Sequence, residues 1–293
     1  MTPPPAFATA STHAVAPEPA PNFSSSAEPS PDELDVPAPS PNHGEIAEAP
    51  EPEPRTFFVG RDEVTVDELV AQIDGLADEI ADSEDVRADY LALVEDAGLV
   101  DSDALYRDYV RVKLAFEATR DGGWWNLSWD ITNEQPNSEQ IWKQWKTAEV
   151  DDTAGPTAIA ECDELSALFA FFARRLSVHG IGLFWPTGNH VIAVWTIDGM
   201  QTRSGSSVRI VVPTSQIFLT ADDSLGTTGF DPWTQKTIFE YRRRDVKGSH
   251  RISGDLARDF VAQIAEHGRK SQAQLQRERN ARAARLVATD GRS

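Results

Sequence analysis

Proline is concentrated at the start of this chain. Residues 1–54 hold fourteen of the nineteen prolines and nine acidic residues, with no lysine or arginine. Such a segment cannot bury enough apolar surface to offset the entropy lost on ordering it, and proline-rich chains stay extended. We therefore predict a disordered acidic tail over 1–54, and a fold made by the residues after it. The tail is either an inert linker or a tether for a protein partner.

The composition of the chain argues against several classes of protein. The chain has 47 Asp and Glu against 27 Lys and Arg, a formal net charge of −20, which disfavours general binding to nucleic acid or to anionic membranes. A single cysteine cannot form an internal disulfide, and no apolar run approaches the roughly 20 residues of a membrane span. The first residues lack the basic and apolar regions of a signal peptide. We expect a cytoplasmic protein, with signal-less specialised export as the alternative.

Residues 55–120 are predicted to be helical. Thr65 and Glu68 have the spacing of a capping box, and a first helix follows them. A second helix is expected from Ser83 to Ala97, with Gly98 ending it, and a third from Ser102 to about residue 121. The apolar residues of these helices recur on one face of each: Leu69, Ile73, Leu76 and Ile80; Tyr90, Leu93 and Val94; Leu105, Tyr109, Val112 and Phe116.

Five of the eight tryptophans lie in residues 124–146, among several Asn and Gln side chains. Tryptophan brings a large apolar surface and one N–H donor, so we interpret the cluster as core packing. The alternative is a groove wall that holds substrate or an oxyanion.

Residues 121–250 are predicted to combine a helix with a sheet. An apolar helix is expected over 161–177, followed by strands over 181–185, 190–197, 208–212 and 237–243. The stretch from Tyr241 to Ser293 carries thirteen Lys and Arg against six Asp and Glu. Residues 251–293 are predicted to form a basic helical segment, with helices expected over 255–267 and 272–286. This basic end is either a solvated helix or a segment that docks onto the chain's own acidic part or onto an anionic partner. Helices followed by hairpin-linked strands indicate an α+β fold with an antiparallel sheet.

Cys162, the one cysteine, falls at the first turn of the predicted helix 161–177. Backbone N–H groups at a helix N-terminus lower the pKa of a thiol, which makes it a better nucleophile. Glu161, Asp163 and Glu164 oppose that effect by like charge. The alternative interpretation is a buried cysteine that packs as a small apolar side chain.

His190 opens a predicted strand downstream of Cys162. An imidazole beside a thiol can take its proton, and a Cys–His pair is the outline of a cysteine-nucleophile enzyme. The alternative is a hydrogen-bonded structural histidine. The sequence contains no metal or cofactor motif, so we expect no cofactor.

Residues 155–214 resemble the core of the transglutaminase-like superfamily, a branch of the papain-like cysteine hydrolases. The family places a cysteine at the start of a long apolar helix, as Cys162 is here. It then has a Gly-x-His strand, here Gly188-Asn189-His190, and a strand that ends in Asp-Pro-Thr. The chain has Val212-Pro213-Thr214 at that point, so Val212 stands where the family has its third catalytic residue. The resemblance implies a nucleophile helix packed on an antiparallel sheet.

A third group must orient His190 for ordinary triad chemistry. Asp231 and Gln216 are the candidates we favour, with Thr214 and Ser215 as neighbours of the expected position; each of them is otherwise a turn residue. The sequence predicts an acyl-transfer enzyme that acts on amide or peptide bonds of a protein or peptide substrate. The alternative is an inactive member of the same fold that serves as a binding, cargo or adaptor module.

Overall fold

The computed structural model describes residues 56–131, 139–147, 155–187, 190–215, 239–240 and 246–290. The predicted tail over 1–54 lies outside these residues, as do Gln216 and Asp231. Residues Glu53–Ser293 belong to one compact unit.

The described elements alternate between helices and short strands. In chain order they are β1 (Glu63–Thr65), α1 (Val66–Ile80), α2 (Glu84–Asp96), α3 (Asp103–Thr119), β2 (Leu127–Trp129), α4 (Glu139–Thr147), β3 (Ala158–Ala160), α5 (Cys162–Arg175), β4 (Ile181–Thr187), β5 (His190–Ile197), a 3-10 turn (Gly199–Gln201), β6 (Val208–Val212), β7 (Phe239–Glu240), β8 (Arg251–Ser253), α6 (Gly254–His267) and α7 (Gln272–Asp290).

Polar side chains set the starts of the first helices, as predicted. Thr65 precedes α1, where its hydroxyl accepts the N–H of Glu68 at 3.2 Å, and the Glu68 carboxylate accepts the N–H of Thr65 at 2.8 Å. The hydroxyl groups of Ser83 and Ser102 accept the N–H of Val86 at the start of α2 and of Leu105 at the start of α3. The chain leaves α2 through Gly98, whose φ of 62° suits glycine.

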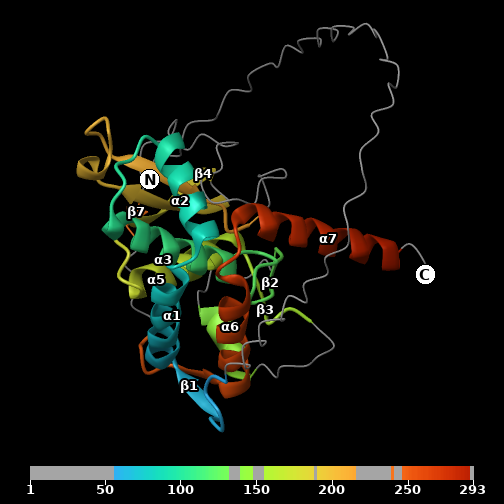
Figure 1. Cartoon of the computed structure of the whole chain (residues 1–293). Helices are drawn as coiled ribbons and strands as arrows, with labels where there is room; N and C mark the ends of the chain where they lie inside the picture. Colours follow the sequence, from blue (N-terminus) through green and yellow to red (C-terminus); the bar gives the residue numbers. More distant parts are fainter. Residues whose placement is uncertain are drawn as a thin grey trace, which may run out of the picture. The chain divides into compact units, whose positions relative to one another are not determined.

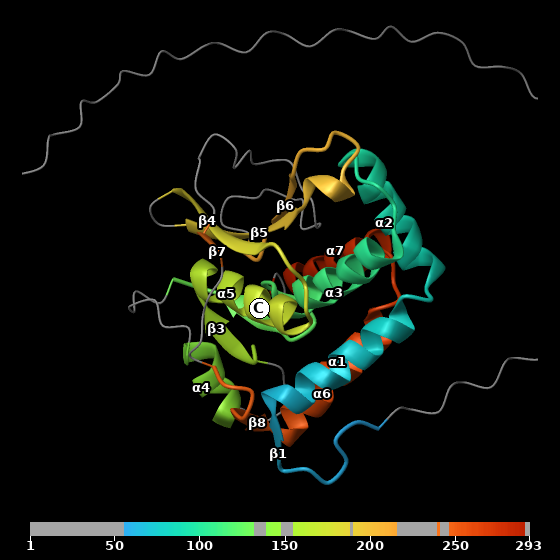
Figure 2. The ribbon, with the colours of Figure 1, turned by 90° about the vertical axis from the view of Figure 1, so that its left-hand side faces the viewer.

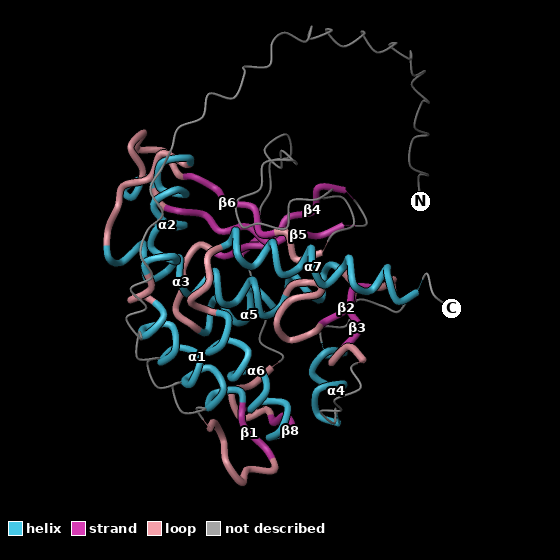
Figure 3. The backbone as a smooth tube through the Cα atoms, turned by 45° about the vertical axis from the view of Figure 1, so that its right-hand side comes forward, coloured by secondary structure: helices cyan, strands magenta, loops and turns pink. Residues whose placement is uncertain are grey.

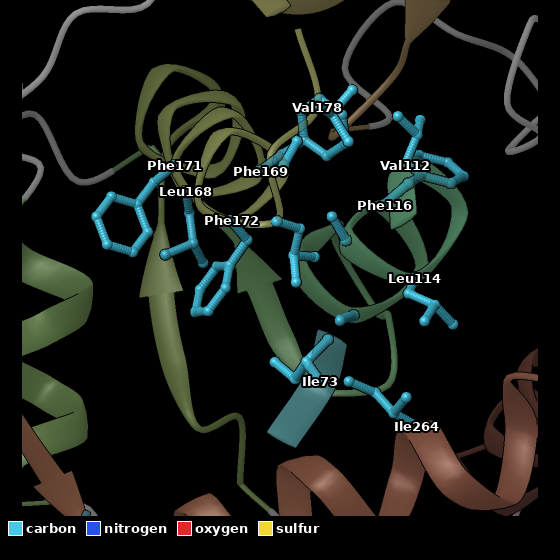
Figure 4. Close-up of a cluster of buried hydrophobic side chains, with 14 of the residues drawn as sticks. Ile73, Val112, Leu114, Phe116, Leu168, Phe169, Phe171, Phe172, Val178 and Ile264 are labelled. Carbon is cyan, nitrogen blue, oxygen red and sulfur yellow. The ribbon is translucent and has the colours of Figure 1, made fainter. Parts of the chain in front are cut away.

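Helix α3 lies at the centre of the molecule. The predicted stripe of Leu105, Tyr109, Val112 and Phe116 is buried, and so are Lys113 and Glu117 beside it. Every residue from Val112 to Thr119 is buried, so the second half of the helix is covered on all sides. Figure 4 shows apolar side chains of α3 and α5 converging with residues of α1 and α6.

The main sheet has four strands in the order β6-β5-β4-β7, and every neighbouring pair is antiparallel. Helix α5 contacts both β5 and β4. The predicted helix on an antiparallel sheet is present, and the fold is mixed α+β. Two further sheets have two strands each, one antiparallel (β1-β8) and one parallel (β2-β3).

The elements form layers. The strands β4, β5 and β6 cover one side of α5 and α3, while α1 and α6 lie on the opposite side (Figure 2). Figure 3 shows the same order from another side, with the short β1-β8 pair at the far end of α1 and α6. Helix α7 follows α6 and is the last element that the structure describes (Figure 1).

The tryptophan cluster belongs to the core, in agreement with the interpretation from sequence. Trp125, Trp142 and Trp145 are buried. The ring of Trp125 stacks on Phe260 of α6 at 4.4 Å between centroids and meets Phe172 of α5 edge-on at 4.8 Å. These contacts join the middle of the chain to α6.

The short elements α4, β1, β8 and the parallel pair β2-β3 were not predicted from sequence. Helix α4 forms within the tryptophan-rich segment, and β1 pairs with β8 although 188 residues separate Glu63 from its hydrogen-bonded partner Arg251. Within the described ranges, no helix is both long and apolar enough to cross a bilayer.

Candidate functional site

Cys162 is the first residue of α5. The chain enters the helix through Glu161 in an extended conformation, and the Glu161 N–H donates to the carboxylate of Glu164 at 3.1 Å. Glu164 therefore stabilises the start of the helix, because its carboxylate accepts a backbone N–H that has no partner within the helix.

The thiol of Cys162 lies in a mostly dry environment, and the residue is 7% exposed. Burial raises the pKa of the thiol, and the nearby charge of Asp163 raises it further. Backbone N–H groups of Val191, Asp163 and Cys162 itself act in the opposite direction. The pKa lowering expected from the helix start is thus present but smaller than the effect of desolvation. At neutral pH the sulfur carries its proton.

His190 is the first residue of β5 and is 2% exposed. Burial lowers the pKa of its imidazole to about 4, because a desolvated site disfavours the charged form. At pH 7 the ring is therefore neutral, which is the state that can accept a proton.

Val191 connects the two candidate residues. It follows His190 directly, and its N–H acts on the Cys162 sulfur. Its carbonyl accepts the hydroxyl of Ser166 at 3.2 Å, one turn along α5 from the cysteine. This hydrogen bond joins helix α5 to the start of β5. The Cys162 sulfur lies against the backbone of Val191, the residue after His190.

The end of β6 lies close to the same place. The Ser166 hydroxyl is 2.7 Å from that of Thr214, and Thr214 and Ser215 are both buried. Thr214 thus contacts Ser166. The hydroxyl of Ser215 is buried without a hydrogen-bond partner among the residues the structure describes.

The position that the family resemblance assigns to an aspartate is apolar here. Val212 is fully buried and pairs with Ala193 of β5, so it supplies no acceptor to His190. The two favoured candidates for the orienting group, Gln216 and Asp231, lie outside the described residues.

The polar atoms of the tryptophan-rich segment are used within the fold. The indole N–H of Trp125 donates to the carbonyl of Phe260 at 3.2 Å, and that of Trp145 donates to the Thr157 hydroxyl at 3.3 Å. The Gln144 amide bonds both backbone groups of Ile159. These side chains hold core and strand together, which is why the groove-wall alternative is not supported at them.

In the described part of the chain, no three His, Cys, Asp or Glu side chains gather as metal ligands do. A polar cavity at the junction of α3, α6 and α7 was not predicted from the sequence; its lining includes Glu117, Arg120, Trp124, His267, Arg279 and Arg282. No family model, no curated protein and no solved structure matches this chain.

Proposed function

We propose that this protein is a cysteine-nucleophile acyl-transfer enzyme of transglutaminase-like or papain-like type, with Cys162 as nucleophile and His190 as general base. The single observation that carries the proposal is the arrangement around Val191. Its N–H acts on the Cys162 sulfur, and it is the residue after His190. The buried helix start of α5 and the buried strand start of β5 are thereby adjacent.

The protonation states decide how such a pair would work. Burial keeps the thiol protonated and the imidazole neutral, so the resting state is not a thiolate–imidazolium pair. Proton transfer then accompanies attack: the S–H proton passes to His190 while sulfur bonds to the substrate carbonyl carbon. When the C–N bond breaks, the imidazolium returns that proton to the leaving amine.

The acyl group is then a thioester on Cys162. Water resolves it in a hydrolase, and a second amine resolves it in a cross-linking enzyme; His190 takes a proton from either one. In this proposal the backbone N–H groups of Cys162 and Asp163, which act on the sulfur, also donate to the developing oxyanion. The substrate class is an amide of a protein or peptide.

Acylation by an activated ester tests the proposal. Incubation with p-nitrophenyl acetate at pH 7.5 should transfer one acetyl group to Cys162 and release nitrophenolate. His190→Ala should slow that step at least roughly 100-fold, because general base catalysis contributes about that much. His179→Ala is the matched control, since His179 is an exposed histidine just after α5. Mass spectrometry locates the acetyl group.

The same reaction examines the third residue. Asp231→Asn and Gln216→Ala should each be compared with the wild type, and the residue that orients His190 should lower the rate more than the other. If His190→Ala acylates as fast as His179→Ala, the proposed pair is wrong.

A second candidate function is a non-catalytic binding or adaptor module. It is favoured by one specific observation: burial moves both pKa values away from those of an activated pair, upward for Cys162 and to about 4 for His190. For this candidate, Cys162→Ser should leave partner binding and unfolding nearly unchanged, and no acyl-enzyme should form.

A further inference from the structure

Helix α2 has apolar side chains on its solvent side. Its buried residues, among them Tyr90, face α3, where the Tyr90 ring contacts Tyr106 and Tyr109. The exposed residues of α2 are Glu84, Asp85, Ala88, Leu91, Ala92, Glu95 and Asp96. Residues three and four apart on a helix are neighbours, so an apolar patch around Leu91, which is 43% exposed, lies between two acidic ends.

Two further exposed apolar side chains lie beside this patch. Val100 is 46% exposed and Met200 is 88% exposed. The N–H of Val100 donates to the carbonyl of Gln201 at 2.8 Å, and Arg203 reaches Glu95 of α2 at 2.7 Å. Figure 2 shows the turn before β6 next to α2. We call this surface the α2 face; its apolar members are Ala88, Leu91, Ala92, Val100 and Met200.

The acidic ends of the α2 face are only partly neutralised. Arg203 pairs with Glu95, whereas Glu84, Asp85 and Asp96 have no cation within ion-pair distance among the described residues. Asp96 lies in the last turn of α2, which holds no basic residue, and the helix dipole disfavours an acid there. Exposed apolar side chains that gather in this way are typical of a contact surface, and the charge at its ends suits a basic partner.

Helix α7 is a basic helix that packs on its own chain through few side chains. Among its described side chains Leu275 alone is buried, and Arg279 pairs with Glu117 at 3.1 Å. Figures 1 and 3 show that the end of α7 extends beyond the other described elements. Most of the stability of a helix in a protein comes from tertiary packing of one face. The exposed face of α7 contains Ala273, Arg277, Ala281 and Ala284.

We propose that α7 of one copy of this chain packs on the α2 face of a second copy, and that the exchange is reciprocal. The two surfaces are complementary, because α7 is basic and carries small side chains, while the α2 face is apolar with acidic ends. The chain itself supplies both surfaces in equal amounts. Cys162 and His190 lie on α5 and β5, so the dimer does not depend on the proposed function.

The place where α7 begins favours a closed dimer. The N–H of Gln272, the first residue of α7, donates to the Asp89 carboxylate of α2 at 2.7 Å. The two helices therefore start side by side, and both reciprocal contacts can lie near one twofold axis. Such a symmetric arrangement closes on itself and does not continue into a filament.

Sedimentation velocity on the full-length protein tests the proposal. The wild type should form a dimer whose share rises with concentration up to about 100 µM. Leu91→Gln should weaken the dimer at least roughly ten-fold, because each dimer loses the burial of two leucine side chains. Arg277→Glu should weaken it by a similar factor, because a like charge then faces the acidic ends at both contacts.

Each variant has a matched control. Ile159→Gln removes an apolar side chain that is 41% exposed on β3, and Lys247→Glu makes the same change of net charge at an exposed site before β8. Both should dimerise within about two-fold of the wild type, since scattered surface substitutions have small effects. Circular dichroism confirms that the four variants are folded.

Three results would overturn the proposal. A folded wild type that stays monomeric at every concentration has no such contact. If Lys247→Glu weakens the dimer as much as Arg277→Glu, net charge and not α7 controls the association. If Leu91→Gln weakens the dimer and Arg277→Glu does not, the α2 face contacts something other than α7.

Discussion

Lys113 is a charged residue with no exposed surface, on the central helix α3. Its ammonium group donates to the carbonyls of Gly268 at 2.9 Å and Lys270 at 2.8 Å. Burial lowers its pKa to about 8, and the charges of Glu117 and Asp89 partly offset that effect. One buried amine therefore supplies the hydrogen bonds that the backbone carbonyl groups need just after the end of α6.

Replacing Lys113 with methionine should destabilise the protein. The change leaves two buried carbonyl groups without a hydrogen-bond donor, which is destabilising. It also removes one buried charge, which is stabilising but by a smaller amount. We expect a loss of about 2 kcal/mol in the free energy of unfolding at pH 7. Denaturant unfolding measures it, and Lys247→Met, at an exposed site, should change it by less than about 0.5 kcal/mol.

The same pair of proteins gives a pH test. The folded-state pKa of Lys113 is about 8, below the ordinary value of 10.5. Between these values the unfolded chain binds more protons than the native one, so stability rises with pH in this window. The wild type should therefore gain stability relative to Lys113→Met from pH 8 to 10.5. A constant difference over that range would contradict the assignment.

At the scale of elements, local side-chain contacts decide where helices begin. The capping box before α1 is the clearest case, and its carboxylate is also held by Arg61 at 2.9 Å. The hydrogen bonds from Thr65, with the one from Arg61, lower the pKa of Glu68 to about 2. The contribution of this carboxylate to stability is present above pH 4.5 and is lost as the pH falls towards 2.

Thr65→Ala should shorten or fray the start of α1. We expect a loss of about 1 kcal/mol in unfolding free energy, as for other N-cap removals. The pKa of Glu68 should move upward, because the hydroxyl donor of Thr65 is lost while the backbone N–H donor remains. Denaturant unfolding and an NMR titration of Glu68 measure the two effects. Thr56→Ala, at an exposed position outside the helices, should produce neither of them.

At the scale of the whole molecule, the end of the chain completes a core that begins near residue 57. Helix α6 contacts both α1 and α3, and β8 pairs with β1. Phe260 of α6 stacks on Trp125 and meets Trp145. Helices α1 and α3 therefore bury apolar side chains against α6, which comes from the other end of the chain.

Two truncations should have opposite outcomes. Removing residues 247–293 takes away β8, α6 and α7 and exposes the aromatic core, so we expect loss of cooperative thermal unfolding. Removing residues 1–54 should change Tm by less than about 3 °C, because this proline-rich segment has little apolar surface to bury. Differential scanning calorimetry on the two variants measures both effects. A large fall in Tm after removal of residues 1–54 would refute the prediction that this segment is a disordered tail.

Much of the fold could be predicted from local patterns. The caps at Thr65, Ser83 and Ser102, the helix that starts at Cys162 and the strand that starts at His190 all depend on residues close in sequence. Helix α4 and the β1-β8 pair could not be predicted in this way, because a nine-residue helix and three-residue strands are too short to be stable until distant partners cover them.

The sequence by itself determined the α+β class, the order of the main elements and the placement of Cys162 and His190 at an element start. These follow from periodicity and capping, which act over a few residues. Only the tertiary structure decided the surroundings of those side chains. Desolvation depends on what packs against a group, and it raises the pKa of Cys162 and lowers that of His190 despite the helix start. For the same reason, the meeting of Glu117, Arg120 and Arg279 in one cavity depends on the packing of α7 against α3, which no local pattern encodes.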